Sequence, residues 1–193
     1  MSYLAQSRSH EALFAELRSL ATRSEITLEE VPAPQKLAPF AIAFSADVMD
    51  PAAPHDEDAD PLATGRFVLL HDPEGQDGWS GQFRCVTYVR SGIDSEMASD
   101  PLLCEIGWSW LLDSLKEFNC SYGSESGTVT RVASVAFGML KEREGDSEIE
   151  IRASWTPLNV DSLTGHLTAW LRLLEISAGL APVPPGVTQI NRR

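Results

Sequence analysis

Apolar and polar residues alternate along several short segments of the chain, with the two-residue period of a half-buried β-strand. The clearest case places Ile149, Ile151 and Ala153 on one face of residues 147–156, with charged or small polar side chains on the other. One buried and one wet face is typical of strands in an antiparallel sheet. Strands are predicted over residues 25–31, 40–48, 65–72, 80–90, 128–137 and 147–156.

Three other segments repeat apolar residues at the spacing of an α-helix. Helices are predicted over residues 9–21, 100–118 and 162–178. The last of them is apolar on most of its sides, because Leu171, Leu173 and Ile176 lie outside its main stripe. Such a helix is either buried deep in the fold or in contact with a second subunit.

The order of these elements is helix, four strands, helix, two strands, helix. Because hairpin-type connections dominate, we expect an α+β fold with an antiparallel sheet of about six strands and three helices, mainly on one face. Type III secretion chaperones have a similar order with one strand fewer, which is an analogy of topology only. A single domain is expected over residues 1–180, followed by a flexible, proline-rich tail at 181–193.

The strand at residues 40–48 has two unlike faces. Phe40, Ile42 and Phe44 lie on one face, and small residues such as Ala41 and Ala43 lie on the other. Two arrangements fit the small face: a helix packed closely against it, or a flat face exposed to solvent.

The charge balance excludes several classes of partner. The chain has 193 residues, 28 of them acidic and 15 basic, for a formal net charge of -13. Nucleic-acid binding and anionic membranes both require clustered Lys and Arg, and no basic run occurs in the sequence. No apolar stretch is long enough for a membrane span. Neither nucleic acid nor a membrane is therefore expected as a partner.

Six acids and three prolines fall between residues 47 and 61, without any Lys or Arg. Repulsion between like charges and the stiffness of proline both oppose regular structure. We expect a mobile acidic loop at residues 47–63.

The cysteines point to a reducing compartment. There are three, Cys85, Cys104 and Cys120, and no two are close enough to form a Cys-x-x-Cys motif. The N-terminus lacks the basic start and apolar run of a signal peptide. The prediction is a cytoplasmic protein with reduced thiols.

Catalytic motifs are absent from the sequence. It contains no Gly-x-Ser-x-Gly, no glycine-rich phosphate loop and no pair of histidines at helical spacing. The acidic loop lacks the glycine and glutamate positions of an EF-hand. We therefore predict no catalytic residue, no metal site and no cofactor, and whether the protein is an enzyme stays open, with the balance against it.

A weak candidate ligand site lies at the hairpin that the predicted strands 65–72 and 80–90 form. His71 and Asp72 end one strand, and a histidine beside a carboxylate can serve as a general base at neutral pH. Asp72 equally fits ordinary turn chemistry, and neighbours on a strand point to opposite faces. Arg84 and Tyr88 follow on the next strand and complete the candidate site.

Arginines are expected to share the polar face of the sheet. Arg84, Arg90 and Arg152 could receive a carboxylate or a phosphate there. Cross-strand pairing with Glu148 and Glu150 is the preferred interpretation.

A protein interface is the other candidate site. Tryptophan is enriched among interface anchors, and Trp79 lies at a turn exit. Together with Leu171, Leu173 and Ile176 of the last helix, it marks a surface for a protein partner or a homodimer.

Several motifs resemble one bacterial family. They are Gly65-Arg66-Phe67-Val68-Leu69-Leu70-His71-Asp72-Pro73, Phe83-Arg84-Cys85-Val86-Thr87-Tyr88-Val89-Arg90, Gly107-Trp108-Ser109-Trp110-Leu111 and Glu150-Ile151-Arg152-Ala153-Ser154-Trp155. Over about residues 10–180 the chain resembles the actinobacterial family of unknown function numbered three thousand. The resemblance implies an actinobacterial cytoplasmic protein and supplies no activity, cofactor or catalytic residue.

Two functions remain open from the sequence. The first is a non-catalytic protein-interaction module, either an adaptor or chaperone-like. The alternative is a small-molecule-binding protein or an enzyme with its site near the hairpin around His71 and Arg84.

Overall fold

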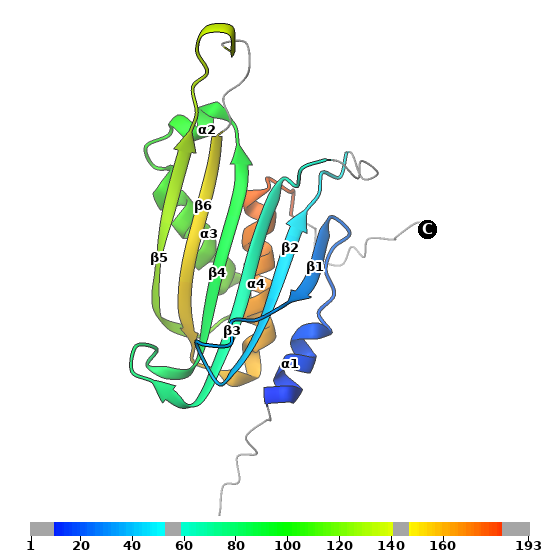
Figure 1. Cartoon of the computed structure of the whole chain (residues 1–193), viewed down its shortest axis with the longest axis vertical. Helices are drawn as coiled ribbons and strands as arrows, with labels where there is room; N and C mark the ends of the chain where they lie inside the picture. The colour runs from blue at the N-terminus through cyan, green and yellow to red at the C-terminus, as the bar shows by residue number, and fades with distance from the viewer. Residues whose placement is uncertain (1–9, 53–58, 141–146, 183–193) are drawn as a thin grey trace, which may run out of the picture.

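The structure is a computed structural model that describes residues 10–52, 59–140 and 147–182. Six antiparallel strands form one sheet in the order β1-β2-β3-β4-β6-β5, and the long helices lie against one of its faces (Figure 1). The α+β prediction is confirmed. The elements are α1 (His10–Arg18), β1 (Ile26–Val31), β2 (Phe40–Val48), β3 (Ala63–Gln76), β4 (Gly81–Ile93), α2 (Ser95–Ser99), α3 (Leu103–Glu117), β5 (Tyr122–Ala133), β6 (Ser147–Pro157) and α4 (Leu163–Ser177).

The element order matches the prediction except for one short helix. α2 occupies five residues before α3, and the side chain of Asp94 caps it by accepting a hydrogen bond of 2.7 Å from the Met97 amide. The following Asp100 accepts a bond from the Leu102 amide, so α3 begins at Leu103, beyond the predicted start.

The main core lies between the sheet and the helices. Trp155 of β6, Trp170 of α4 and Phe67 of β3 are completely buried there. The apolar excess of α4 belongs to this core: Leu171 is 5% exposed and Leu173 is 0% exposed. Of the two alternatives for this helix, the structure shows burial deep in the fold.

A second, smaller core lies on the opposite face of the sheet. Ala43 of β2 and both Val68 and Leu70 of β3 are buried there, although no described helix covers them. The connection between β1 and β2, residues 32–39, crosses this face and packs against them through Ala33 and Ala38. Neither alternative for the small face of β2 was right, because an irregular segment covers it.

The prediction for β5 was wrong at both ends. The strand was expected over residues 128–137, but it begins at Tyr122. Pairing with β6 continues on both sides of an irregularity between Gly123 and Ser126, where Ser124 has a φ of 52°. The strand ends at Ala133 because its partner, Ser147, is the first residue of β6.

The β3–β4 hairpin is confirmed, with its turn displaced. The predicted strands at 65–72 and 80–90 leave the turn to the residues between them, yet β3 extends to Gln76 and the reversal occupies residues 77–80. Pro73 is tolerated because pairing with β4 is interrupted between His71 and Gln76.

Two sequence predictions concern segments outside the described residues. These are the core of the acidic loop, residues 53–58, and most of the tail, residues 183–193. Within the described part of the chain, no helix combines the length and apolar character needed to span a bilayer.

Candidate functional site: the open face of the sheet

The sheet face opposite α1, α3 and α4, called the open face below, is where polar side chains of four strands come together. Strand register places Arg66, Tyr88, Arg152 and Thr128 side by side on β3, β4, β6 and β5. The next row toward the β3–β4 turn is less polar. It consists of Val68, Val86, Ser154 and Ser126.

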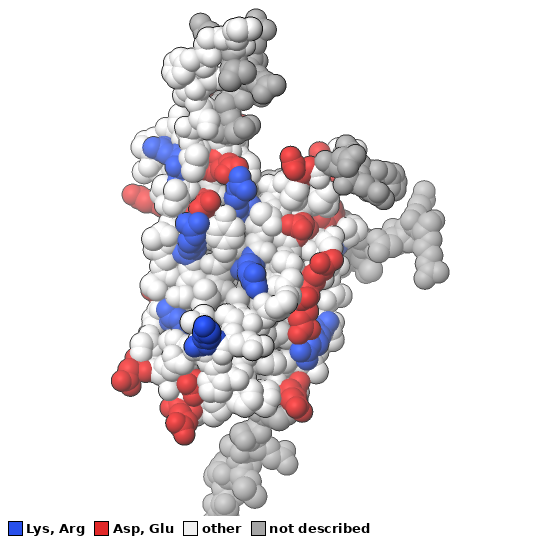
Figure 2. Space-filling model, in the orientation of Figure 1, with Lys and Arg blue, Asp and Glu red and all other residues white. Residues whose placement is uncertain are grey.

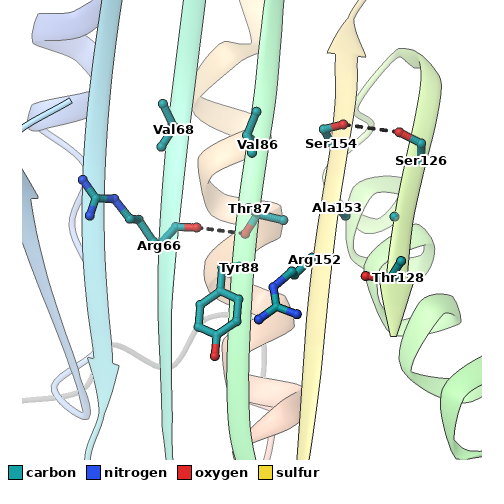
Figure 3. A pocket seen from close by; sticks show the side chains of 11 residues that line it. Arg66, Val68, Val86, Thr87, Tyr88, Ser126, Thr128, Arg152, Ala153 and Ser154 are labelled. Carbon is teal, nitrogen blue, oxygen red and sulfur yellow. Dashed lines mark hydrogen bonds between the residues drawn. The ribbon is translucent and has the colours of Figure 1, made fainter. Parts of the chain in front are cut away.

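A shallow cavity of about 530 Å³, called the trough below, lies over these two rows (Figure 3). Val68 and Val86 form its apolar floor, and Arg66 and Arg152 flank it. The segment 32–39 limits it on the β2 side, where Ala33 and Ala38 pack against the small core. The trough therefore combines an apolar surface with guanidinium groups along one side.

The cations of the trough differ in how far they are neutralised. Arg152 pairs with Glu150 at 2.8 Å, and its guanidinium lies 5.2 Å from the centre of the Tyr88 ring. Tyr88 donates a hydrogen bond of 3.2 Å to the same carboxylate. Arg66 is exposed and donates to the Pro32 carbonyl at 2.7 Å, and it forms no ion pair with a carboxylate of residues 10–52, 59–140 and 147–182. Arg66 is thus the more available cation.

Basic side chains occupy the middle of the open face, whereas acidic ones lie mostly toward its margins (Figure 2). The exceptions are Glu148 and Glu150 on β6, and both are engaged: Arg90 pairs with Glu148 through two nitrogens, and Arg152 pairs with Glu150. The preferred interpretation of cross-strand pairing is therefore confirmed for Arg90, whereas Arg152 pairs with Glu150 of its own strand.

Arg84 departs from that interpretation. It is 8% exposed and makes no ion pair with any described carboxylate. Its Nη1 donates to the Ser124 carbonyl at 2.8 Å and to Thr156 at 3.0 Å, and its Nη2 donates to Ser126 and Ser154. Burial lowers the pKa of Arg84. The guanidinium acts as a clamp that joins β4 and β6 to the irregular part of β5.

This clamp gives a testable effect on stability. Arg84→Met keeps the apolar stem and removes four hydrogen bonds, so the free energy of unfolding should fall by about 2 kcal/mol in urea titration. Arg90→Met, on the same strand and face, breaks an exposed pair and should have a much smaller effect. Equal losses for the two variants would contradict a structural role specific to Arg84.

His71 lies on the other side of the sheet. Its ring stacks on Phe83 at 4.2 Å between centroids and lies 5.8 Å from Phe40, which in turn stacks on His10 of α1. Its Nδ1 is buried without a hydrogen-bond partner in the described structure. Burial, reinforced by His10, lowers the pKa of His71 against the opposing effect of Asp72. The imidazole therefore packs as an aromatic ring.

The four candidate ligand residues do not form one site. Asp72 accepts hydrogen bonds from the Glu74 amide and the Gln76 side chain, which is ordinary turn chemistry. His71 is directed to the helix-covered face, whereas Arg84 and Tyr88 are on the open face. Strand alternation separates them, so the predicted site around His71 and Arg84 is corrected. Only the open face, which carries Arg84 and Tyr88, remains a candidate site.

The interface candidates are also divided. Leu171 and Leu173 are inside the core, so in this fold they offer no surface to a partner. Ile176 is half-buried near the end of α4. Trp79 is half-buried and packs against the small core of the open face.

Two of the three cysteines, Cys85 and Cys120, are buried. All three cysteines are free. Burial raises the pKa of Cys120 to about 11 and raises that of Cys85 well above its ordinary value, which keeps both as neutral thiols at pH 7. Within residues 10–52, 59–140 and 147–182, His, Cys, Asp and Glu do not cluster as a metal site would require.

Arg66, Ser126 and Ser154 escaped the sequence reasoning. The sequence predicts that the strand of Arg66 forms a hairpin with the next strand, but not which residues lie beside Arg66. Ser126 and Ser154 belong to two strands whose register with each other the sequence does not give. The one available signal was strand parity, which places Arg66 with Val68 and Leu70 on one face.

Comparison with known proteins adds a family and no activity. No curated protein and no solved structure matches the chain. The match to a family described as protein of unknown function (DUF3000) extends over residues 6–188, nearly the whole sequence. The predicted family is thus confirmed, and the chain belongs to the DUF3000 family.

Proposed function

We propose that this protein is a non-catalytic protein-interaction module, an adaptor or chaperone-like protein, that contacts its partner through the segment after β5. Residues 134–140, called the arm below, project from the end of the sheet (Figure 1). Val135, Phe137 and Met139 of the arm are 72%, 79% and 103% exposed. These three exposed apolar side chains are the observation that carries the proposal.

Exposure of this kind is costly unless it serves a contact. A side chain of the size of Phe or Met contributes about 1.5–3 kcal/mol when it is fully buried. Single exposed apolar residues are common on protein surfaces, but a contiguous apolar group is typical of an interaction site. The arm places three such residues at alternate positions, so a partner can bury them together.

The edge of the sheet beside the arm supports the same proposal. β5 has twelve residues and pairs only with β6 among the described strands. It contains no proline and no lysine, the residues that commonly protect an edge strand. Its free backbone N–H and C=O groups can accept an added strand, a frequent mode of peptide recognition.

The interior supports a binding role over a catalytic one. The candidate acid–base residue His71 is packed between aromatic rings, and Arg84 is fully used in holding β5. The three free cysteines are compatible with the reducing cytoplasm in which we place the protein.

The test is site-specific photo-crosslinking in the native host. A photoreactive phenylalanine analogue at position 137 should give one dominant protein adduct, identified by mass spectrometry. The same analogue at Leu37, which is 54% exposed in the connection between β1 and β2, should not. A Met139→Ser change should reduce the adduct at 137 severalfold, with unchanged thermal unfolding.

The mass of the crosslinked product distinguishes a second copy of this chain from a different partner protein. A product of twice the chain mass identifies a second copy, and any other single product identifies a heterologous partner. Adducts at position 137 that are no stronger than those at position 37 would contradict the proposed interface.

A further inference from the structure

We propose that the trough on the open face binds an aliphatic carboxylate: an extended hydrocarbon chain over Val68 and Val86, with its carboxylate on Arg66. This inference goes beyond the interaction through the arm and rests on different residues. It is carried by the juxtaposition of an apolar floor with a guanidinium that no described carboxylate neutralises.

The charge distribution favours a small anion. The chain carries a net charge of -13, so a large polyanion is repelled before it reaches the open face. Within that face, however, Arg66 and Arg152 are close to the trough, and Glu150 neutralises only the second. A ligand with a single carboxylate gains the local attraction with little of the long-range repulsion.

The donors of Arg66 suit a carboxylate. Its Nη2 is bound to the Pro32 carbonyl, which holds the side chain toward β2 (Figure 3) and leaves other N–H groups free of described partners. A guanidinium presents its donors as a fork that matches the two oxygens of a carboxylate. Arg152, two strands away in the same row, adds a second positive charge.

The floor sets the size of the hydrocarbon part. From β3 to β5 the trough crosses three strand spacings, or about 14 Å at the usual distance between neighbouring strands. Its volume of about 530 Å³ lies within the range of small-molecule sites. A chain of roughly ten carbons fits this length.

Decanoate is therefore the probe, with decanol as its uncharged counterpart. Isothermal titration at pH 7 should show one saturable site for decanoate and at least tenfold weaker binding of decanol, as expected from loss of a charge-assisted contact. Arg66→Gln should weaken decanoate binding by about tenfold or more. Arg90→Gln, with the same loss of charge on the same face but outside the trough, should leave the affinity unchanged.

A second variant tests the floor. Val86 is 36% exposed, so Val86→Asp should preserve the fold, checked by thermal unfolding, and abolish decanoate binding by repulsion. The proposal is overturned if wild-type protein shows no saturable binding at millimolar decanoate. It is equally overturned if decanol binds as tightly as decanoate, or if Arg66→Gln and Arg90→Gln behave alike.

Discussion

Gly127→Ala is expected to lower the free energy of unfolding by about 3 kcal/mol, at the upper end of overpacking effects. A Cβ at this position would lie 2.3 Å from the Arg152 carbonyl oxygen and 2.7 Å from the Trp108 ring. The first neighbour is backbone of the paired strand β6, which cannot rotate away. The added methyl group must therefore push β5 from β6 or displace α3, to which Trp108 belongs.

Gly123→Ala provides a control on the same strand. A Cβ there would meet only the Leu158 side chain, at 3.7 Å, which is ordinary contact. Urea unfolding of the two variants should differ by about 2 kcal/mol or more. If the two alanine variants are equally stable, the close approach of β5 to β6 and Trp108 is not as described.

Gly127 also shows why β5 was misplaced by sequence reasoning. The run Gly123-Ser124-Glu125-Ser126-Gly127 has the composition of a turn, and local chemistry favoured a link. The structure instead keeps it in the sheet, because the Arg84 side chain binds the Ser124 carbonyl and Ser126. The contact between Arg84 and Ser124 joins residues 40 positions apart and outweighs the local preference for a turn. A pattern within the segment itself cannot reveal such a contact.

The rest of the fold could be predicted from the sequence because it depends on the periodicity of apolar residues. Alternation identified the ends of β1, β2 and β6 to within one residue, and the helical stripes identified α3 and α4. Each of these patterns reports which side of an element is buried, and antiparallel strands joined by short connections leave few ways to assemble them.

The site was less accessible because it depends on register between strands distant in sequence. The row that contains Arg66, Tyr88 and Arg152 exists only because β6 pairs with β4 rather than with the edge strand β1. The cover over Ala43 is likewise supplied by an irregular segment without periodicity. Sequence reasoning placed Arg84, Arg90 and Arg152 together on the polar face by parity, but it combined His71 with Arg84 and Tyr88 by proximity in the chain.

Acidification is expected to destabilise the protein through His166, which is completely buried on α4. Its Nδ1 accepts a hydrogen bond of 3.0 Å from the Trp155 indole, so the ring is neutral in the folded state. Burial lowers the pKa of His166 to about 4, against about 6.5 in the unfolded chain. Between these values the unfolded state binds more protons, so stability is complete above pH 6.5 and falls as the pH drops toward 4.

Between pH 7 and pH 4.5 this histidine should account for about 2 kcal/mol of lost stability. Urea unfolding of wild type and His166→Gln at both values isolates that part, since the carboxylates titrate alike in both proteins. Trp155→Phe removes the hydrogen bond but keeps the ring buried, and it should retain most of the pH dependence because desolvation is the cause of the shift. If His166→Gln and wild type lose the same stability on acidification, the buried imidazole is not what makes the core sensitive to acid.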